Sequence, residues 1–192
     1  MRGRKDEIRS EQRRRTLSEA ERTSQSAALT DVLSTIAAIA RADAVSMFVG
    51  KDHEPDTASL FERLAPRARW FPTVTGRTAL GWTEVREWSE LTPGRFGLLE
   101  PAAPTHAQMP DSVQVVLVPG LAFDRYGGRL GWGRGFYDRA LAAVPSALRI
   151  GVCLRPGLVA TVLPMDAHDR PMHAVVTPDG VVFGENTLRG SQ

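Results

Sequence analysis

The feature that most constrains the fold is a short apolar run, Val113 to Val118, which ends at Pro119 and Gly120. Only Gln114 interrupts its valine and leucine side chains. A run of this kind is typical of a β-strand that is buried on both faces. Such strands lie inside parallel sheets that helices cover on both sides. The run therefore predicts a layered α/β domain.

Helical and extended segments alternate along the rest of the chain, as such a domain requires. Residues 5–40 carry apolar side chains at three- and four-residue steps without Pro or Gly, which predicts helix. A break is expected near Thr16 and Ser18, either of which could cap a second segment. Further helices are predicted at 57–65 and 136–143. Strands are predicted at 44–49, 67–71, 79–83, 113–118, 150–154 and 174–177, with a possible edge strand at 181–183.

Two segments rich in Pro and Gly interrupt this alternation. Residues 90–112 are interpreted as an ordered loop, and residues 120–135 as glycine-rich turns. We therefore expect a single three-layer α/β domain with a mostly parallel sheet flanked by helices over residues 1–187. Residues 188–192 are expected to form a disordered tail.

Charge and cysteine usage exclude several classes of protein. The formal net charge of +2 is too small to indicate a nucleic-acid-binding protein, and Arg13 to Arg15 lack interleaved aromatic residues. No apolar stretch approaches the roughly 20 residues that span a bilayer. Cys153 is the only cysteine, so it cannot form an intramolecular disulfide. We expect a buried thiol in a cytoplasmic monomer, without nucleic-acid or membrane partners.

The strongest functional signal lies directly before the helix predicted at 136–143. Three glycines alternate there beside two arginines: Gly131, Gly133 and Gly135, with Arg129 and Arg134. Glycine lets a ligand approach the backbone closely, and the free amides of a helix N-terminus favour an anion. Guanidinium groups suit bidentate phosphate contacts. The segment therefore predicts a triphosphate site, and the alternative is a connection that only turns the chain. It matches neither the Walker A sequence nor a dinucleotide fingerprint.

The longer stretch Val118 to Asp138 resembles the signature of the 5-formyltetrahydrofolate cyclo-ligase family, also called methenyltetrahydrofolate synthetase. A Pro-Gly-Leu-Ala-Phe-Asp block and a Gly-x-Gly-x-Gly-aromatic-Tyr-Asp block stand in the family's order and spacing. Further similar elements are Lys5-x-x-Ile8-Arg9, Phe48-Val49 with Glu54 and Thr57, Gly97 to Pro101, Leu163-Pro164, His168-Asp169 and Val175 to Thr177. The resemblance implies an ATP- and Mg²⁺-dependent ligase. It would cyclise 5-formyltetrahydrofolate to 5,10-methenyltetrahydrofolate with release of ADP and phosphate.

The resemblance also implies roles for particular residues. Lys5 and Arg134 are expected to act in catalysis. The expected ATP contacts are Lys5, Arg9, Arg129, Leu130, Gly131, Trp132, Gly133, Arg134, Gly135, Phe136 and Tyr137. The expected folate contacts are Val49, Glu54, Trp132, Gly133, Arg134, Gly135 and Phe136. Asp138 and Asp169 are expected to share one Mg²⁺, because this ion binds one or two carboxylates together with phosphate oxygens and water.

Simpler interpretations of these residues stay open. Lys5 and Arg9 could be solvent charges on a basic helix, Asp138 could only complement its helix dipole, and Glu54 could be a loop charge before Pro55. For the whole chain, the alternative is a non-catalytic folate- or nucleotide-binding protein on the same fold.

Three positions depart from the family's usual pattern. Phe136 stands where Tyr is usual, Arg155 to Gly157 occupy a region where many members carry a Gln, and His173 replaces an acidic residue. The phosphate-binding elements are therefore better supported than the folate site.

Overall fold

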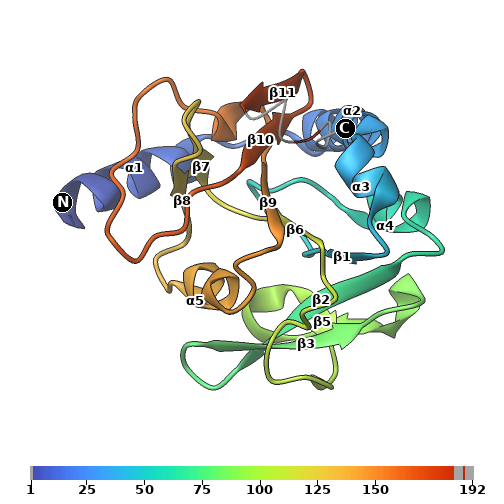
Figure 1. Cartoon of the computed structure of the whole chain (residues 1–192). Coiled ribbons are helices and arrows are strands. Elements are labelled where there is room, and N and C mark those ends of the chain that lie inside the picture. Colours follow the sequence, from blue (N-terminus) through green and yellow to red (C-terminus); the bar gives the residue numbers. More distant parts are fainter. Residues whose placement is uncertain (1, 184–187, 189–192) are drawn as a thin grey trace.

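A seven-stranded sheet forms the centre of the computed structural model, which describes residues 2–183 and 188 (Figure 1). The strand order is β11-β10-β9-β6-β1-β2-β3. These strands are β1 (Ala44–Ser46), β2 (Ala68–Thr75), β3 (Ala79–Glu84), β6 (Val115–Val118), β9 (Leu148–Val152), β10 (Ala174–Thr177) and β11 (Gly180–Phe183). The inner pairs are parallel, and the outer pairs β10–β11 and β2–β3 are antiparallel. The prediction of a mostly parallel sheet is confirmed.

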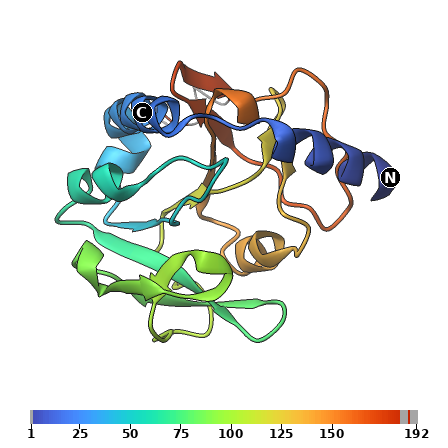
Figure 2. The same ribbon diagram turned by 180° about the vertical axis from the view of Figure 1, so that it is seen from behind.

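Helices cover both faces of this sheet, as Figures 1 and 2 show from opposite sides. The helices are α1 (Arg2–Arg14), α2 (Glu19–Thr35), α3 (Ala37–Arg41), α4 (Ala58–Arg63) and α5 (Phe136–Ala143). Strand β6 shows the layering. Val115 and Leu117 join an apolar cluster with side chains of α2, α3 and α4, whereas Val116 and Val118 join a second cluster with Leu141 of α5. The predicted three-layer α/β fold is confirmed.

The long N-terminal helical segment is broken where the sequence predicted a break. Ser18 rather than Thr16 caps α2: its Oγ accepts the backbone N–H of Glu21 at 3.3 Å. The Glu21 carboxylate in turn accepts the backbone N–H of Ser18 at 2.9 Å. This capping box fixes the start of α2. The break lets α1 extend beside β7 and β8, away from α2 (Figure 1).

Both segments interpreted as loops contain short antiparallel pairs. In the first, β4 (Leu91–Pro93) pairs with β5 (Leu99–Pro101), and in the second, β7 (Ala122–Phe123) pairs with β8 (Arg129–Leu130). The buried carboxylate of Asp124 supports the second pair. Asp124 Oδ1 accepts the N–H groups of Tyr126 and Gly128, each at 2.8 Å. Strands of two or three residues are too short to show an alternating pattern, so sequence periodicity missed them.

Three smaller expectations concern the tail, the membrane and the thiol. The expected tail at 188–192 lies outside the described residues apart from Leu188, whose side chain packs in the larger apolar cluster. Within the described chain, no helix has the length and apolar character that a membrane crossing needs. Cys153 is buried as predicted, and burial raises the pKa of its thiol to about 12.

Candidate active site

The glycine segment forms a loop between β8 and α5, and two of its glycines have backbone conformations that other residues rarely adopt. Gly133 has φ +96° and Gly135, the N-cap of α5, has φ +64°. A Cβ atom at Gly133 would also lie 3.4 Å from Cζ of Arg9. The positive φ favours glycine at this point, whereas the contact with the Arg9 side chain would tolerate a Cβ.

Helix α1 is docked onto this loop. Arg9 Nε donates to the carbonyl oxygen of Gly131 at 3.0 Å, and Arg9 Nη1 pairs with Asp6 Oδ1 at 2.7 Å. Ile8 packs against a small apolar cluster that includes Leu130. An open cavity of about 580 Å³, the first cavity, lies at this contact. It is lined by Asp6, Arg9, Ser10, Arg13, Arg14, Trp132 and Gly133.

A second cavity also borders the loop and measures about 580 Å³. It is lined by Arg77, Thr78, Arg95, Phe96, Gly133, Arg134 and Phe136, with no carboxylate among them. The guanidinium of Arg134 lies 5.0 Å from the ring centroid of Phe96, an aromatic side chain that is 49% exposed. Gly133 lines both cavities, so ligands bound in the two would meet at the glycine loop.

Glu54 is buried and contacts this loop, although it stands 78 positions before Trp132 in the sequence. Its Oε1 accepts the indole N–H of Trp132 at 3.0 Å, and the Arg22 guanidinium holds the Glu54 carbonyl oxygen at 2.9 Å. Burial raises the pKa of Glu54 to about 7, although the Trp132 hydrogen bond opposes the shift. The carboxyl group therefore changes charge near neutral pH. Val49 is half-buried and packs against the larger apolar cluster.

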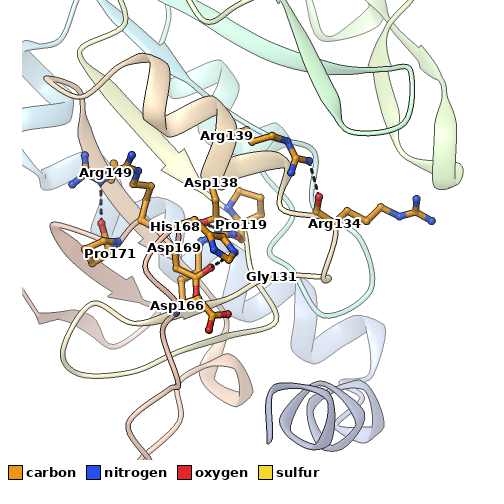
Figure 3. A network of polar contacts seen from close by, with 12 residues as sticks. Pro119, Gly131, Arg134, Asp138, Arg139, Arg149, Asp166, His168, Asp169 and Pro171 are labelled. Carbon is orange, nitrogen blue, oxygen red and sulfur yellow. Dashed lines mark hydrogen bonds and ion pairs between the residues drawn. The ribbon is translucent and has the colours of Figure 1, made fainter. Parts of the chain in front are cut away.

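The two predicted metal ligands, Asp138 and Asp169, lie in neighbouring segments at the C-terminal side of the loop (Figure 3). Asp138 Oδ1 accepts Arg129 Nη2 at 2.6 Å and the backbone N–H of Arg170 at 3.2 Å. Arg170 directly follows Asp169, so the structure brings Asp138 beside the segment that carries Asp169. Asp169 Oδ2 accepts Lys5 Nζ at 2.5 Å.

Sequence reasoning missed Asp166, which groups with His168 and Asp169 and not with Asp138. Its Oδ2 accepts Lys5 Nζ at 2.6 Å. Ligand atoms of Asp166, His168 and Asp169 all lie within 4.8 Å of one another. The signal that could have found Asp166 is its spacing, because it stands three residues before Asp169 in a segment already selected for a carboxylate.

Three predicted ATP residues are more enclosed than a ligand contact requires. The buried Arg129 guanidinium holds Asp138 and lies 3.5 Å from the Pro119 carbonyl oxygen. Leu130 is 2% exposed in an apolar cluster, so a nucleotide could contact its main chain only. The Tyr137 hydroxyl is buried without a hydrogen-bond partner among the described residues, and burial raises its pKa.

Of the three departures from the family pattern, one lines a cavity and two do not. Phe136 lines the second cavity, where a tyrosine would add one hydroxyl. Arg155 instead forms an exposed ion pair with Asp179 at 2.7 Å. His173 lies 2.7 Å from a guanidinium nitrogen of Arg149, and burial together with that charge lowers its pKa. Neither Arg155 nor His173 lines either cavity.

Comparison with known proteins decides the family. The sequence matches the model of the 5-formyltetrahydrofolate cyclo-ligase family over residues 2–178. The chain belongs to this family. A 5-formyltetrahydrofolate cyclo-ligase of Mycolicibacterium smegmatis is 34% identical over 174 residues, which are 87% of this chain and 89% of that protein. The enzyme of Escherichia coli K12 is 33% identical over 177 residues, 88% of this chain and 97% of that protein.

Solved structures agree with this assignment. The NMR structure of the Aquifex aeolicus 5,10-methenyltetrahydrofolate synthetase matches this cyclo-ligase with a TM-score of 0.80 at 33% identity, covering 92% of this chain and 91% of that chain. A synthetase of Mycoplasma pneumoniae gives a TM-score of 0.69 at 16% identity, which supports the fold alone. The chain is therefore a ligase of folate one-carbon metabolism.

Proposed function

We propose that this cyclo-ligase joins its two substrates across the glycine loop, with ATP in the first cavity and 5-formyltetrahydrofolate in the second. The products are 5,10-methenyltetrahydrofolate, ADP and phosphate. The observation that carries this arrangement is the position of Gly133, which lines both cavities. A phosphoryl group held at Gly133 would be within reach of a folate in the second cavity.

The first cavity has the chemistry of a phosphate site. Arg9, Arg13 and Arg14 supply guanidinium groups from one helix, and the only acidic side chain of the lining, Asp6, is paired with Arg9. Guanidinium binds phosphate oxygens bidentately. The backbone amides and positive dipole end of α5 lie on the side of the second cavity, which Phe136 lines. Arg134 is exposed beside the loop, where it is expected to contact the phosphoryl group as it moves.

The residues present also fit a magnesium ion. Oδ2 of Asp138 accepts no hydrogen bond within residues 2–183, and Asp169 already binds a cation, the Lys5 ammonium. Asp138 and Asp169 would hold Mg²⁺ beside the phosphates, and water would complete its coordination. When bound, the ion offsets the charge of the phosphate oxygens during transfer.

The second cavity fits the folate, because Phe96 and Phe136 offer aromatic faces for a flat ring. Glu54 lines neither cavity, and its partner Trp132 lines the first, so a folate whose ring nitrogens donate to the Glu54 carboxylate must extend past the glycine loop. The formyl oxygen takes the γ-phosphoryl group, nitrogen 10 attacks the activated carbon, and phosphate leaves. Phosphoryl transfer needs positioning and charge neutralisation, which the loop, Lys5 and Arg134 would supply.

The test is turnover of the purified protein with ATP, Mg²⁺ and 5-formyltetrahydrofolate. We expect the methenyl chromophore to appear with one ADP released per product, and no ADP in the absence of the folate. Binding of either ligand without product would favour the alternative, a non-catalytic folate- or nucleotide-binding protein.

Glu54→Gln is expected to weaken 5-formyltetrahydrofolate binding about 10-fold, because a hydrogen bond to a charged group contributes about 1.5–3 kcal/mol. ATP affinity should change little. Since the pKa of Glu54 is raised to about 7, folate affinity of the parent protein should increase as pH rises through that value, and the variant should lose this dependence. The same raised pKa makes the free energy of unfolding fall as pH rises from about 4.5 to about 7, because over this range the unfolded chain loses the Glu54 proton before the folded protein does.

Isothermal titration with each ligand across this pH range checks the prediction. Glu62→Gln is the matched control, because it makes the same change at an exposed carboxylate of α4 that does not contribute to the Glu54 pKa. Equal loss of folate and ATP binding in Glu54→Gln would instead indicate a folding defect.

The compartment and the assembly stay predictions. We expect a cytoplasmic location and a monomer, and a free, buried thiol at Cys153 is in line with the first.

A further inference from the structure

The Lys5 side chain is almost fully enclosed, although a lysine on a helix surface is usually exposed. It is 7% exposed, and its ammonium lies between two carboxylates, 2.6 Å from Asp166 Oδ2 and 2.5 Å from Asp169 Oδ2. Figure 3 shows Asp166, His168 and Asp169 gathered beside Asp138. The ammonium therefore binds Asp169, one of the two carboxylates assigned to a metal, together with Asp166.

These contacts conflict with the roles assigned above if nothing moves. A Mg²⁺ bound to the Asp169 oxygen that holds the Lys5 ammonium would bring two cations to contact distance, where they repel each other. Two of the three N–H groups of that ammonium are already used by Asp166 and Asp169, which leaves little of Lys5 for phosphate oxygens. Mg²⁺ and the Lys5 ammonium therefore compete for Asp169.

We propose that Lys5 occupies the position of the metal in the nucleotide-free protein, that Asp166 holds it there, and that Mg²⁺ displaces its ammonium toward the first cavity. This inference rests on the proposed function of the site. Asp166 is a positioning residue in this scheme, and Asp169 changes partner from Lys5 to Mg²⁺. Lys5 would become available to phosphate only after the metal has bound.

The geometry allows this exchange without movement of α1. Arg9 and Ile8 anchor the helix to the loop and to the small apolar cluster, independently of Lys5. The four-carbon stem of a lysine can then carry the ammonium to a new partner by rotation about its own bonds. Arg9, one turn further along α1, already lines the first cavity.

The sequence makes the exchange directly observable, because Lys5 and Lys51 are the only lysines. Protein labelled with ¹³C at lysine Cε and ¹⁵N at Nζ should give two side-chain signals. MgCl₂ added without nucleotide, with KCl at matched ionic strength as control, is expected to shift the Lys5 signal to a saturating value. Exchange of its ammonium protons with water should accelerate. Lys51, which donates to the Phe96 carbonyl oxygen at 2.7 Å, should not respond.

Asp166→Asn tests the positioning residue. Loss of one charge-assisted hydrogen bond to Lys5 should lower the Mg²⁺ concentration at the midpoint of the Lys5 shift about 10-fold. Glu11→Gln is the matched control, since Glu11 lies on α1 with Lys5 and the change removes only an exposed ion pair with Arg15. Its midpoint should equal that of the parent.

Each outcome decides the proposal. A Lys5 signal that does not respond to Mg²⁺ would show a static ion pair that only anchors α1, and would overturn the exchange. A midpoint that rises in Asp166→Asn would make Asp166 a metal ligand and would overturn its positioning role. If the parent protein turns over 5-formyltetrahydrofolate while the Lys5 signal does not respond to Mg²⁺, the proposed exchange is wrong and the proposed function still holds. Absence of turnover would count against the proposed function itself.

Discussion

Asp138→Asn is expected to reduce turnover by on the order of 10²–10³-fold, the loss that follows removal of one fixed charge-stabilising group in other enzymes. The variant should also need more Mg²⁺ for half-maximal rate. The reason is that Asn keeps the shape of Asp138 and loses the negative charge that faces the metal. Folate binding measured without metal should stay close to that of the parent.

The contacts of Asp138 require a second measurement. Arg129 is a buried guanidinium that pairs with Asp138 at 2.6 Å, so the variant weakens an ion pair as well as a metal ligand. Thermal unfolding should therefore be followed beside the kinetics. Asp179→Asn is the matched control, because it removes a carboxylate that pairs with the exposed Arg155.

Asp169→Asn should act in the same direction as Asp138→Asn, and less severely if its contact with the metal runs through water. An unchanged Mg²⁺ requirement in both variants would contradict a shared metal site.

Gly133→Val is expected to abolish most ATP binding, with at least about 10-fold weaker affinity in correctly folded protein. The backbone at Gly133 has φ +96°, which costs a residue with a side chain about 1–2 kcal/mol or more. A side chain there would also crowd Arg9, which lies 3.4 Å from the position of the new Cβ. The backbone strain and the contact with Arg9 would both disturb the loop where phosphate is proposed to bind.

Gly180→Val provides the control for backbone strain. Gly180 has φ +126° in the turn between β10 and β11, and a Cβ there would meet nothing within 4 Å. Titration calorimetry with ATP should separate the two variants, since both are strained and only one alters the loop. ATP affinity equal to the parent's in Gly133→Val would place the phosphate site elsewhere.

The architecture was predictable wherever one segment carried its own periodic pattern. The run at Val113 to Val118 predicted a strand buried on both faces, and its side chains do divide between two apolar clusters. Helix α5 has the predicted bounds, because glycines end before Phe136 and a helical pattern starts there. The short pairs β4–β5 and β7–β8 could not be predicted, since each strand has only two or three residues and depends on its partner.

The site was predictable in part for the same reason. The glycine loop is continuous in sequence, so its position before a helix was visible from the residues alone. The contacts of Lys5 with Asp166 and Asp169 join residues 161 and 164 positions apart, and no local pattern encodes such a distance. The enclosed state of Lys5 and the burial of Glu54 could come only from the three-dimensional arrangement.

The docking of α1 also has a consequence for the order in which the chain matures. A ribosome makes α1 well before its partners at Gly131, Asp166 and Asp169. Contacts of such long sequence separation form late, because a long loop must close before they stabilise anything. The strands from β1 to β9 can therefore pair while α1 is still unattached. The catalytic surface is completed only when the last third of the polypeptide has emerged, so an interrupted chain has no competent site.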